Sequence, residues 1–141
     1  FRLLDERLPF LISVSFSHFK SPHGWRLDLI LRARRLECGF YGALTKETVI
    51  GLLAFCHEDE PLDYSIYWLF RFMIDKDHQN KGYGKQVLSL LVEEVKQLGG
   101  KTLFTMHKPS NQQAGKLYRA FGFQEDGILD DGDISLRLEL S

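Results

Sequence analysis

Residues 67–84 read Tyr67-Trp-Leu-Phe-Arg-Phe-Met-Ile-Asp-Lys-Asp-His-Gln-Asn-Lys-Gly-Tyr-Gly84. An aromatic and aliphatic run stops at charged residues and then passes through a Gln-x-x-Gly-x-Gly turn into an apolar-periodic segment. This order predicts a strand, a glycine turn and a helix. The turn would direct several backbone N–H groups, and the positive end of the helix dipole, at one point. The stretch therefore predicts a site for an anionic group, best suited to a pyrophosphate.

The segments on either side of this stretch indicate a mixed fold. Strands are expected at residues 1–4, 37–44, 49–57, 65–74, 101–107, 121–125 and 133–140. Helices are expected at residues 8–19 and 25–36, from Gly84 to the Gly99-Gly100 pair, and from Ser110, as the N-cap, to Ala120. The predicted fold class is α/β (α+β), with a twisted, mostly antiparallel sheet and helices on both faces.

Composition narrows the class of protein. The 141 residues predict one domain, and the formal net charge of −1 gives no general attraction to nucleic acid or to an anionic membrane. The apolar run at residues 8–16 is too short to span a bilayer, so no membrane segment is expected. Cys38 and Cys56 lie in apolar segments without metal-ligand spacing, which favours small buried thiols and a reducing, cytoplasmic setting.

Three kinds of glycine turn bind phosphates, and two of them do not fit. A Walker A loop needs Gly-Lys-Ser/Thr, but Gln86 follows Gly84-Lys85. A dinucleotide fingerprint needs a third glycine, where this chain has Val87. The remaining pattern, from Gln79 to Gly84, is that of enzymes that use acyl-coenzyme A.

Over about residues 37–140 the chain resembles the GNAT superfamily of N-acetyltransferases, most closely at Gln79–Gly84 and Asn111–Phe123. Residues 68–75, followed by His78-Gln79, resemble the bacterial polyamine (spermine/spermidine) acetyltransferases. The resemblance implies a sheet splayed at its centre that holds acetyl-coenzyme A as co-substrate, with no metal. Homodimers are a further expectation from the family.

The resemblance also implies roles for single residues. The backbone of Phe72, Met73 and Ile74 would pair with the pantetheine arm, and an N–H near Ile74 could stabilise the oxyanion. Tyr118 matches the tyrosine that protonates the leaving thiolate, or it is a core or edge aromatic residue that packs on Phe121 and Phe123. Asn111 matches the asparagine that holds the cofactor arm, or it caps the start of its helix. The pyrophosphate would be held by the amides of Gln79, Asn80, Lys81, Gly82, Tyr83, Gly84 and Lys85. Lys81, Lys85 and Lys116 are either phosphate contacts or solvated surface charges.

One departure leaves proton removal open. Polyamine enzymes of this type carry an acidic residue just before the position of Arg71, where this chain has Phe70. The candidate bases are Glu58, Asp59, Tyr67 and His107, the first three also being candidate substrate-binding residues. Two acidic segments, residues 58–63 and 125–133, would either attract a polycation or be solvated loops.

These observations predict an acetyl-coenzyme A-dependent N-acetyltransferase of a small, polyamine-like amine. The amine would attack the thioester directly in a ternary complex. Two alternatives stay open at this point. One is the same chemistry on a protein or peptide amine or on an aminoglycoside, and the other is a sensor that binds acyl-coenzyme A without turnover.

Overall fold

The computed structural model describes the backbone of residues 12–13, 18–20, 25–33, 39–45, 48–59, 61–74 and 76–141, and the side chains of 51–58, 61–74 and 76–141. The strands are β1 (Ile12–Ser13), β2 (His18–Lys20), β3 (Trp25–Ala33), β4 (Gly39–Thr45), β5 (Thr48–Asp59), β6 (Leu62–Ile74), β7 (Thr102–His107), β8 (Gln124–Ile128) and β9 (Ile134–Glu139). The helices are α1 (Tyr83–Gln97) and α2 (Gln112–Phe121), and a short 3-10 turn, η1 (Lys76–His78), precedes α1.

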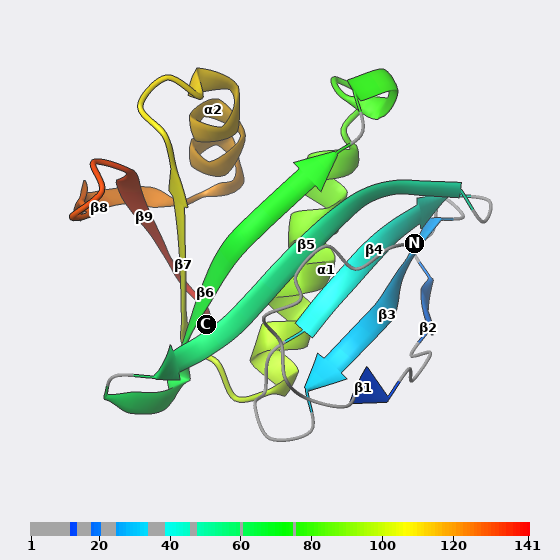
Figure 1. The fold of residues 1–141 in the computed structure, drawn as a ribbon, viewed down its shortest axis with the longest axis horizontal. Coiled ribbons are helices and arrows are strands. Elements are labelled where there is room, and N and C mark those ends of the chain that lie inside the picture. Colours follow the sequence, from blue (N-terminus) through cyan, green and yellow to red (C-terminus); the bar gives the residue numbers. More distant parts are fainter. Residues whose placement is uncertain are drawn as a thin grey trace.

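The described strands form one mixed sheet (Figure 1). Its order is β1-β3-β4-β5-β6-β7-β9-β8, with β2 also paired to β3. Only β6 and β7 are parallel among the described pairs, because α1 carries the chain back between them. The predicted fold class is confirmed, as is the strand–turn–helix order of residues 67–84.

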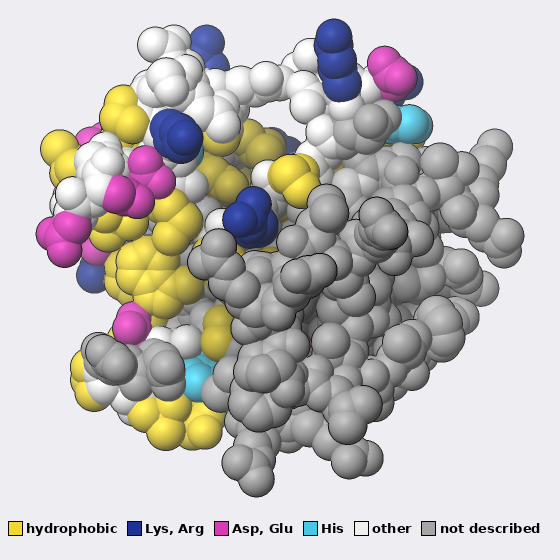
Figure 2. Space-filling view, in the orientation of Figure 1, with side chains coloured by type: hydrophobic (Ala, Val, Ile, Leu, Met, Phe, Trp, Pro, Cys, Tyr) yellow, Lys and Arg dark blue, Asp and Glu magenta, His cyan; other side chains and the backbone are white. Residues whose placement is uncertain are grey.

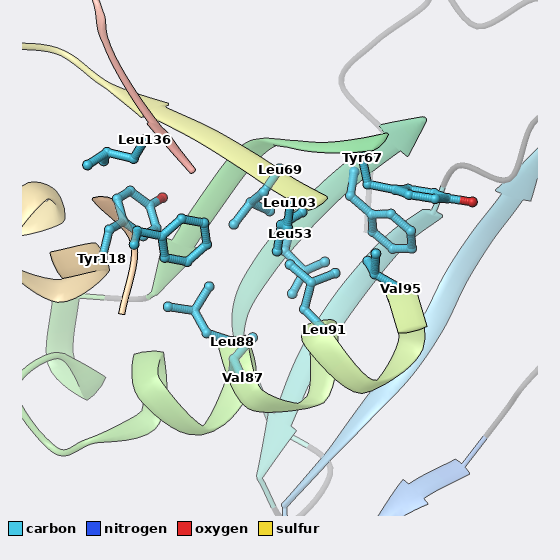
Figure 3. Close-up of a cluster of buried hydrophobic side chains, with 12 residues drawn as sticks. Leu53, Tyr67, Leu69, Val87, Leu88, Leu91, Val95, Leu103, Tyr118 and Leu136 are labelled. Atoms are coloured by element: carbon cyan, nitrogen blue, oxygen red, sulfur yellow. The ribbon is translucent and has the colours of Figure 1, made fainter. Parts of the chain in front are cut away.

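The core lies where α1 packs on the middle of the sheet (Figure 3). Val87, Leu88, Leu91 and Val95 recur at helical spacing and are buried, so they form the inner face of α1. They meet apolar side chains of β5, β6 and β7, and along β7 buried and partly exposed positions alternate. Tyr118 of α2 joins the same cluster.

The two N-terminal helices predicted at residues 8–19 and 25–36 are wrong wherever the structure describes that region. It has strands β1, β2 and β3 there. In residues 25–33 apolar residues occupy every second position, 25, 27, 29, 31 and 33, which is a strand period rather than a helical one. The opening strand predicted at residues 1–4 lies outside the described residues.

Three smaller predictions also need correction. The N-cap of α2 is Asn111 and not Ser110, because the Asn111 side chain accepts from the Ala114 N–H. The acidic segment at residues 58–63 is not one long loop, since β5 runs to Asp59 and β6 begins at Leu62. Cys56 is disulfide-bonded, so the predicted thiol is wrong, and its partner lies outside the described residues. Apolar surroundings suit a half-cystine as well as a thiol.

None of the helices in the described part of the chain is long and apolar enough to cross a membrane.

Candidate active site

The sheet splits between its two parallel strands. Strands β6 and β7 pair only from Ile66 opposite Thr102 to Leu69 opposite Thr105. Beyond that point β6 stays paired with β5 as far as Ile74, whereas β7 continues with β9. Figure 1 shows the two strands diverging. Residues 70–74 of β6 therefore have no described strand partner on the side that faces away from β5.

A β-bulge marks the closed end of this split. Phe55 pairs with Leu69 and Ala54 pairs with Arg71, so Phe70 is an extra residue in β6. A bulge of this kind bends its strand and increases the local twist. The bulge therefore accounts for the departure of β6 from β7 immediately after Leu69.

A buried hydroxyl lies at the same point. The Thr105 hydroxyl donates to the carbonyl oxygen of Leu69 over 3.0 Å. Thr105 is fully buried. This bond satisfies a carbonyl at the last paired position, where the regular ladder ends.

The glycine turn lies beyond the open end of the split and starts α1. Gly82 is the N-cap, with φ 81° in the left-handed region, and no side chain in the described part of the chain caps this helix end. There is also no acidic residue in the first turn. The start of a 15-residue helix thus suits an anion through the helix dipole. The anion site itself stays a prediction.

Gln79 ties the turn to the strand before it and to α2. Its Nε2 donates to the Ile74 carbonyl oxygen over 2.9 Å, and its Oε1 accepts from Gln113 Nε2 at 3.4 Å. Asn80 has φ 60°, the left-handed backbone shape that the sequence pattern requires there. Lys81 and Lys85, on either side of Gly82, are exposed.

Gly84 allows close approach of the two helices. A Cβ atom added there would lie 3.0 Å from Leu117 Cδ2 and 3.8 Å from Phe72 Cε1. Tyr83, beside it, is half-buried. The second glycine of the turn is therefore needed for packing, and the turn sits between α2 and the end of β6.

Tyr118 lies on the core side of the split. It is 4% exposed, and its ring centroid is 6.4 Å from that of Phe72 and 5.6 Å from that of Phe123. Burial raises the pKa of the Tyr118 phenol above its ordinary value, while a hydrogen bond with the Thr105 side chain acts the other way. Because Thr105 marks the closed end of the split, the Tyr118 hydroxyl is at that end.

Asn111 and Lys116 are both on α2 and exposed. The Asn111 Oδ1 accepts from the Ala114 N–H at 3.2 Å, a capping bond that uses only the oxygen of the amide. Its Nδ2 donors are not used in that bond. Met73 is 52% exposed and Ile74 is half-buried.

The candidate acceptor residues lie in different places. Glu58 is half-buried and accepts from Trp68 Nε1 over 2.6 Å. Tyr67 is fully buried in the core cluster, away from any surface that a substrate could reach. Asp59 ends β5, and its side chain lies outside the described side chains. Of these three residues, the structure shows only the Glu58 side chain in a partly accessible position.

His107 faces helix α2. It is 6% exposed, and its Nδ1 lies 2.8 Å from the Lys108 carbonyl oxygen, to which it donates. Its Nε2 is buried without a hydrogen-bond partner in the described part of the molecule. A Cβ atom added at Gly115 would lie 2.8 Å from that nitrogen. The imidazole therefore packs on the α2 backbone rather than toward an acceptor.

Sequence reasoning missed Thr105 and Gln113. Thr105 could have been noticed in the strand Thr102-Leu-Phe-Thr-Met-His107, because it places a hydroxyl on the same side of the strand as the apolar Leu103. No local pattern pointed to Gln113, because its contact is with a residue 34 positions earlier in the chain.

Comparison with known proteins agrees with this architecture. The pattern of the Acetyltransferase (GNAT) family matches residues 5–123. The chain is 36% identical over 103 residues to a probable spermine N(1)-acetyltransferase of Bacillus subtilis subsp. natto, which covers 67% of this chain and 66% of that protein, just under two thirds of its length. It is 37% identical over 60 residues to the ribosomal protein bS18-alanine N-acetyltransferase of Escherichia coli, covering 43% of this chain and 40% of that protein.

Among solved structures, the chain is similar to a GNAT family acetyltransferase from Elizabethkingia anophelis with acetyl-CoA bound. The TM-score is 0.63 at 21% identity, covering 73% of this chain and 76% of that chain. This likeness concerns the fold.

Proposed function

Because the chain belongs to the Acetyltransferase (GNAT) family, we propose that it transfers the acetyl group of acetyl-coenzyme A to a small, polyamine-like amine. The observation that carries this proposal is that the buried hydroxyls, the split and the start of α1 follow one another along one path. The split between β6 and β7 has Tyr118 and Thr105 at its closed end and the uncapped α1 N-terminus beyond its open end. The similarity to a probable spermine acetyltransferase favours a polyamine.

The residues at the open end suit the diphosphate of coenzyme A. The amides from Asn80 to Lys85, at the start of α1, would hold the pyrophosphate, whereas the Gln79 N–H donates to the Lys76 carbonyl oxygen. Lys81, Lys85 and Lys116 are exposed and would add positive charge around it. The amide edge of residues 72–74, which has no strand partner on the split side among the described residues, would bind the pantetheine arm as a strand. The Asn111 side-chain amide would donate to the same arm.

Tyr118 would act as general acid. The nitrogen of a neutral amine attacks the thioester carbonyl, a C–N bond forms, the C–S bond breaks, and its electron pair goes to sulfur. The Tyr118 hydroxyl gives its proton to that sulfur and is restored by the proton that the amine releases. The Tyr118 phenol is protonated at neutral pH, and burial raises its pKa further above the ordinary value.

The donor that stabilises the oxyanion has to lie at the same point along the split as the Tyr118 hydroxyl, because the carbonyl carbon and the sulfur are bonded to each other. Ile74 is at the open end of the split, where its carbonyl is held by Gln79. Phe72 packs on the Tyr118 ring. We therefore place the oxyanion nearer the Phe72 amide and leave Ile74 to the cofactor arm.

A second candidate function is acetylation of a peptide amino group. It is favoured by the similarity, over 60 residues, to an enzyme that acts on the alanine of a ribosomal protein. The two functions differ in what the acceptor carries besides its amine. A polyamine offers further ammonium groups, whereas a peptide offers amides that need backbone partners.

The deciding experiment follows thiol release from acetyl-coenzyme A with a panel of acceptors. We expect release with spermidine and spermine and little with an alanine-terminated peptide. The reverse order would favour the peptide function. Coenzyme A binding without thiol release from any amine would support a non-catalytic sensor instead.

A further inference from the structure

The sheet has a second face at the split, opposite to the core cluster. Tyr67 and Leu69 of β6 are fully buried in the core, so Trp68 between them projects to the other side. On β7 the same holds for Phe104, which lies between the buried Leu103 and Thr105. Since α1 and Tyr118 fill the core face, an acceptor has to approach the split from this second face.

Trp68 and Phe104 form an aromatic pair at the closed end of the split. They are directly opposite each other in the β6–β7 register, one position before the last pair. Their ring centroids are 4.7 Å apart and their planes are inclined by 20°, so the rings are stacked. Both side chains are half-buried, which leaves part of the pair accessible.

A carboxylate is held against this pair. The Trp68 indole N–H donates to Glu58 Oε2 over 2.6 Å, which fixes the orientation of the carboxylate. No ion pair to Glu58 is found among the described residues. One hydrogen bond leaves most of the acceptor capacity of the carboxylate unused. A half-buried carboxylate at the edge of an indole ring is an arrangement that binds an ammonium group, through charge and hydrogen bonds together.

We propose that Glu58, Trp68 and Phe104 form a subsite for the distal ammonium group of the acceptor. This proposal rests on the proposed function and deepens it. Glu58 is three positions along β5 from Phe55, which pairs with Leu69 at the split, so the separation along the strand is about 10 Å.

The charge on the same face sets the direction of the acceptor. Arg71 lies next to the bulge residue Phe70 at the split, and it is exposed. Phe72 projects to the core side, so its neighbour Arg71 projects to the second face. A positive charge at the split disfavours an ammonium group there, whereas Glu58 favours one at the far end. The uncharged, reacting amine is thus directed to the split.

The test compares wild type with Glu58→Gln. Glutamine keeps the size of the side chain and an oxygen that accepts from the Trp68 N–H, but it removes the charge. We expect kcat/KM for spermidine to fall about 10-fold or more, mainly through KM, because a bond to a charged group is lost. For butylamine, which has no distal ammonium, kcat/KM should be unchanged. Glu93→Gln, on the exposed side of α1, is the matched control and should leave both values unchanged.

A loss that is equal for spermidine and butylamine, or no loss with spermidine, would overturn the subsite. Binding can also be measured without turnover. In a Trp25→Phe background Trp68 is the single tryptophan, and its fluorescence should respond to spermidine with about 10-fold weaker affinity after Glu58→Gln. Equal affinity in both proteins would contradict the subsite. If wild type binds spermidine through Glu58 but acetylates no amine, the subsite stands and the proposed function fails.

Discussion

At the scale of single residues, the phenol of Tyr118 depends on its surroundings for its chemistry. It is 4% exposed, between Phe72 and Phe123, and burial raises its pKa. An exposed tyrosine would also be protonated at neutral pH, but it would not lie beside Thr105 at the end of the split. Its position in the tertiary structure therefore matters more for the proposed role than its acidity does.

Replacing Tyr118 with phenylalanine tests that role. We expect Tyr118→Phe to lower turnover with the preferred amine by about 10²-fold or more, since a positioned general acid contributes that much. Affinity for coenzyme A should change little, because the ring still packs on Phe72. A thiol-release assay would measure turnover, and calorimetric titration would measure the affinity for coenzyme A. Turnover equal to that of wild type would remove Tyr118 from the mechanism.

The raised pKa of Tyr118 also predicts that the free energy of unfolding depends on pH. Because the pKa of Tyr118 is raised in the folded state above its ordinary value of 10.0, the folded state holds this proton more tightly. The resulting stabilisation is complete below that value and is lost as the pH rises through the folded-state pKa. Urea unfolding from about pH 8 to about pH 11 should show wild type losing stability relative to Tyr118→Phe only in the alkaline range. A constant difference would contradict the raised pKa.

Gly115 is a second position where a neighbour decides the outcome. Alanine in place of a glycine inside a helix ordinarily stabilises it by about 1 kcal/mol. Here the new Cβ would lie 2.8 Å from the buried His107 Nε2 and 2.5 Å from Nη1 at the far end of the exposed Arg119 side chain. We expect Gly115→Ala to destabilise the fold by about 1–3 kcal/mol in chemical unfolding. In a His107→Ala background the same change should be neutral or stabilising, and a loss there would show that His107 is not the cause.

At the scale of elements, β6 and β7 share four residue pairs before they part. The Thr105 hydroxyl adds one more hydrogen bond, to the Leu69 carbonyl, at the point of separation. The bulge at Phe70 bends β6 away, and the Gln79 side chain fastens its far end to the glycine turn. These contacts hold apart the two arms of the sheet, of which one ends in β6 and the other is formed by β7, β9 and β8.

Thr105→Val tests the closed end of the split. Valine matches threonine in shape but leaves the buried Leu69 carbonyl without this donor, which costs about 1–3 kcal/mol. Thr102→Val is the matched control on the same strand, because Thr102 donates to Glu139 at an exposed site. We expect about 0.5 kcal/mol or less for the control. Equal losses in urea unfolding would mean that the Leu69 bond has no special role.

At the scale of the whole molecule, the arm of the sheet formed by β7, β9 and β8 carries a cluster of acidic side chains. Acidic side chains gather over the β8–β9 turn on one side of the split, as Figure 2 shows, and the residues concerned are Asp126, Asp130 and Asp131 together with Glu125. Arg119 forms an ion pair with Glu125, so part of this charge is neutralised within the arm. The surface formed by Asp126, Asp130 and Asp131 remains acidic.

Coenzyme A should bind in the split and contact both arms of the sheet. We expect the amides of residues 71–74 that point toward the split to become more protected from hydrogen exchange when coenzyme A binds. The buried amides of β5 should change less. Gly82→Val places a β-branched residue at φ 81° and should weaken binding and abolish the added protection. Binding without any change at residues 71–74 would contradict the placement of the pantetheine arm.

The amino-acid sequence by itself determined the order strand, glycine turn, helix at residues 67–84, and with it the prediction of an anion site. These features are local: an apolar period, a turn that needs left-handed residues, and helix donors that follow it in the chain. The helix from Gly84 and the strands from residue 39 onward were predicted for the same reason. The strand at residues 25–33 also had a local signal, a period of two, which we interpreted wrongly as a helix.

Only the tertiary structure decided which residues meet across the sheet. The Thr105 bond to Leu69, the Gln113 bond to Gln79 and the Glu58 bond to Trp68 join positions 36, 34 and 10 residues apart. It also decided that Tyr67 is a core residue while Trp68, its neighbour, lies on the second face. A sequence pattern records the period of each element, but the partners of a side chain depend on the register between elements, which is set when the whole sheet packs.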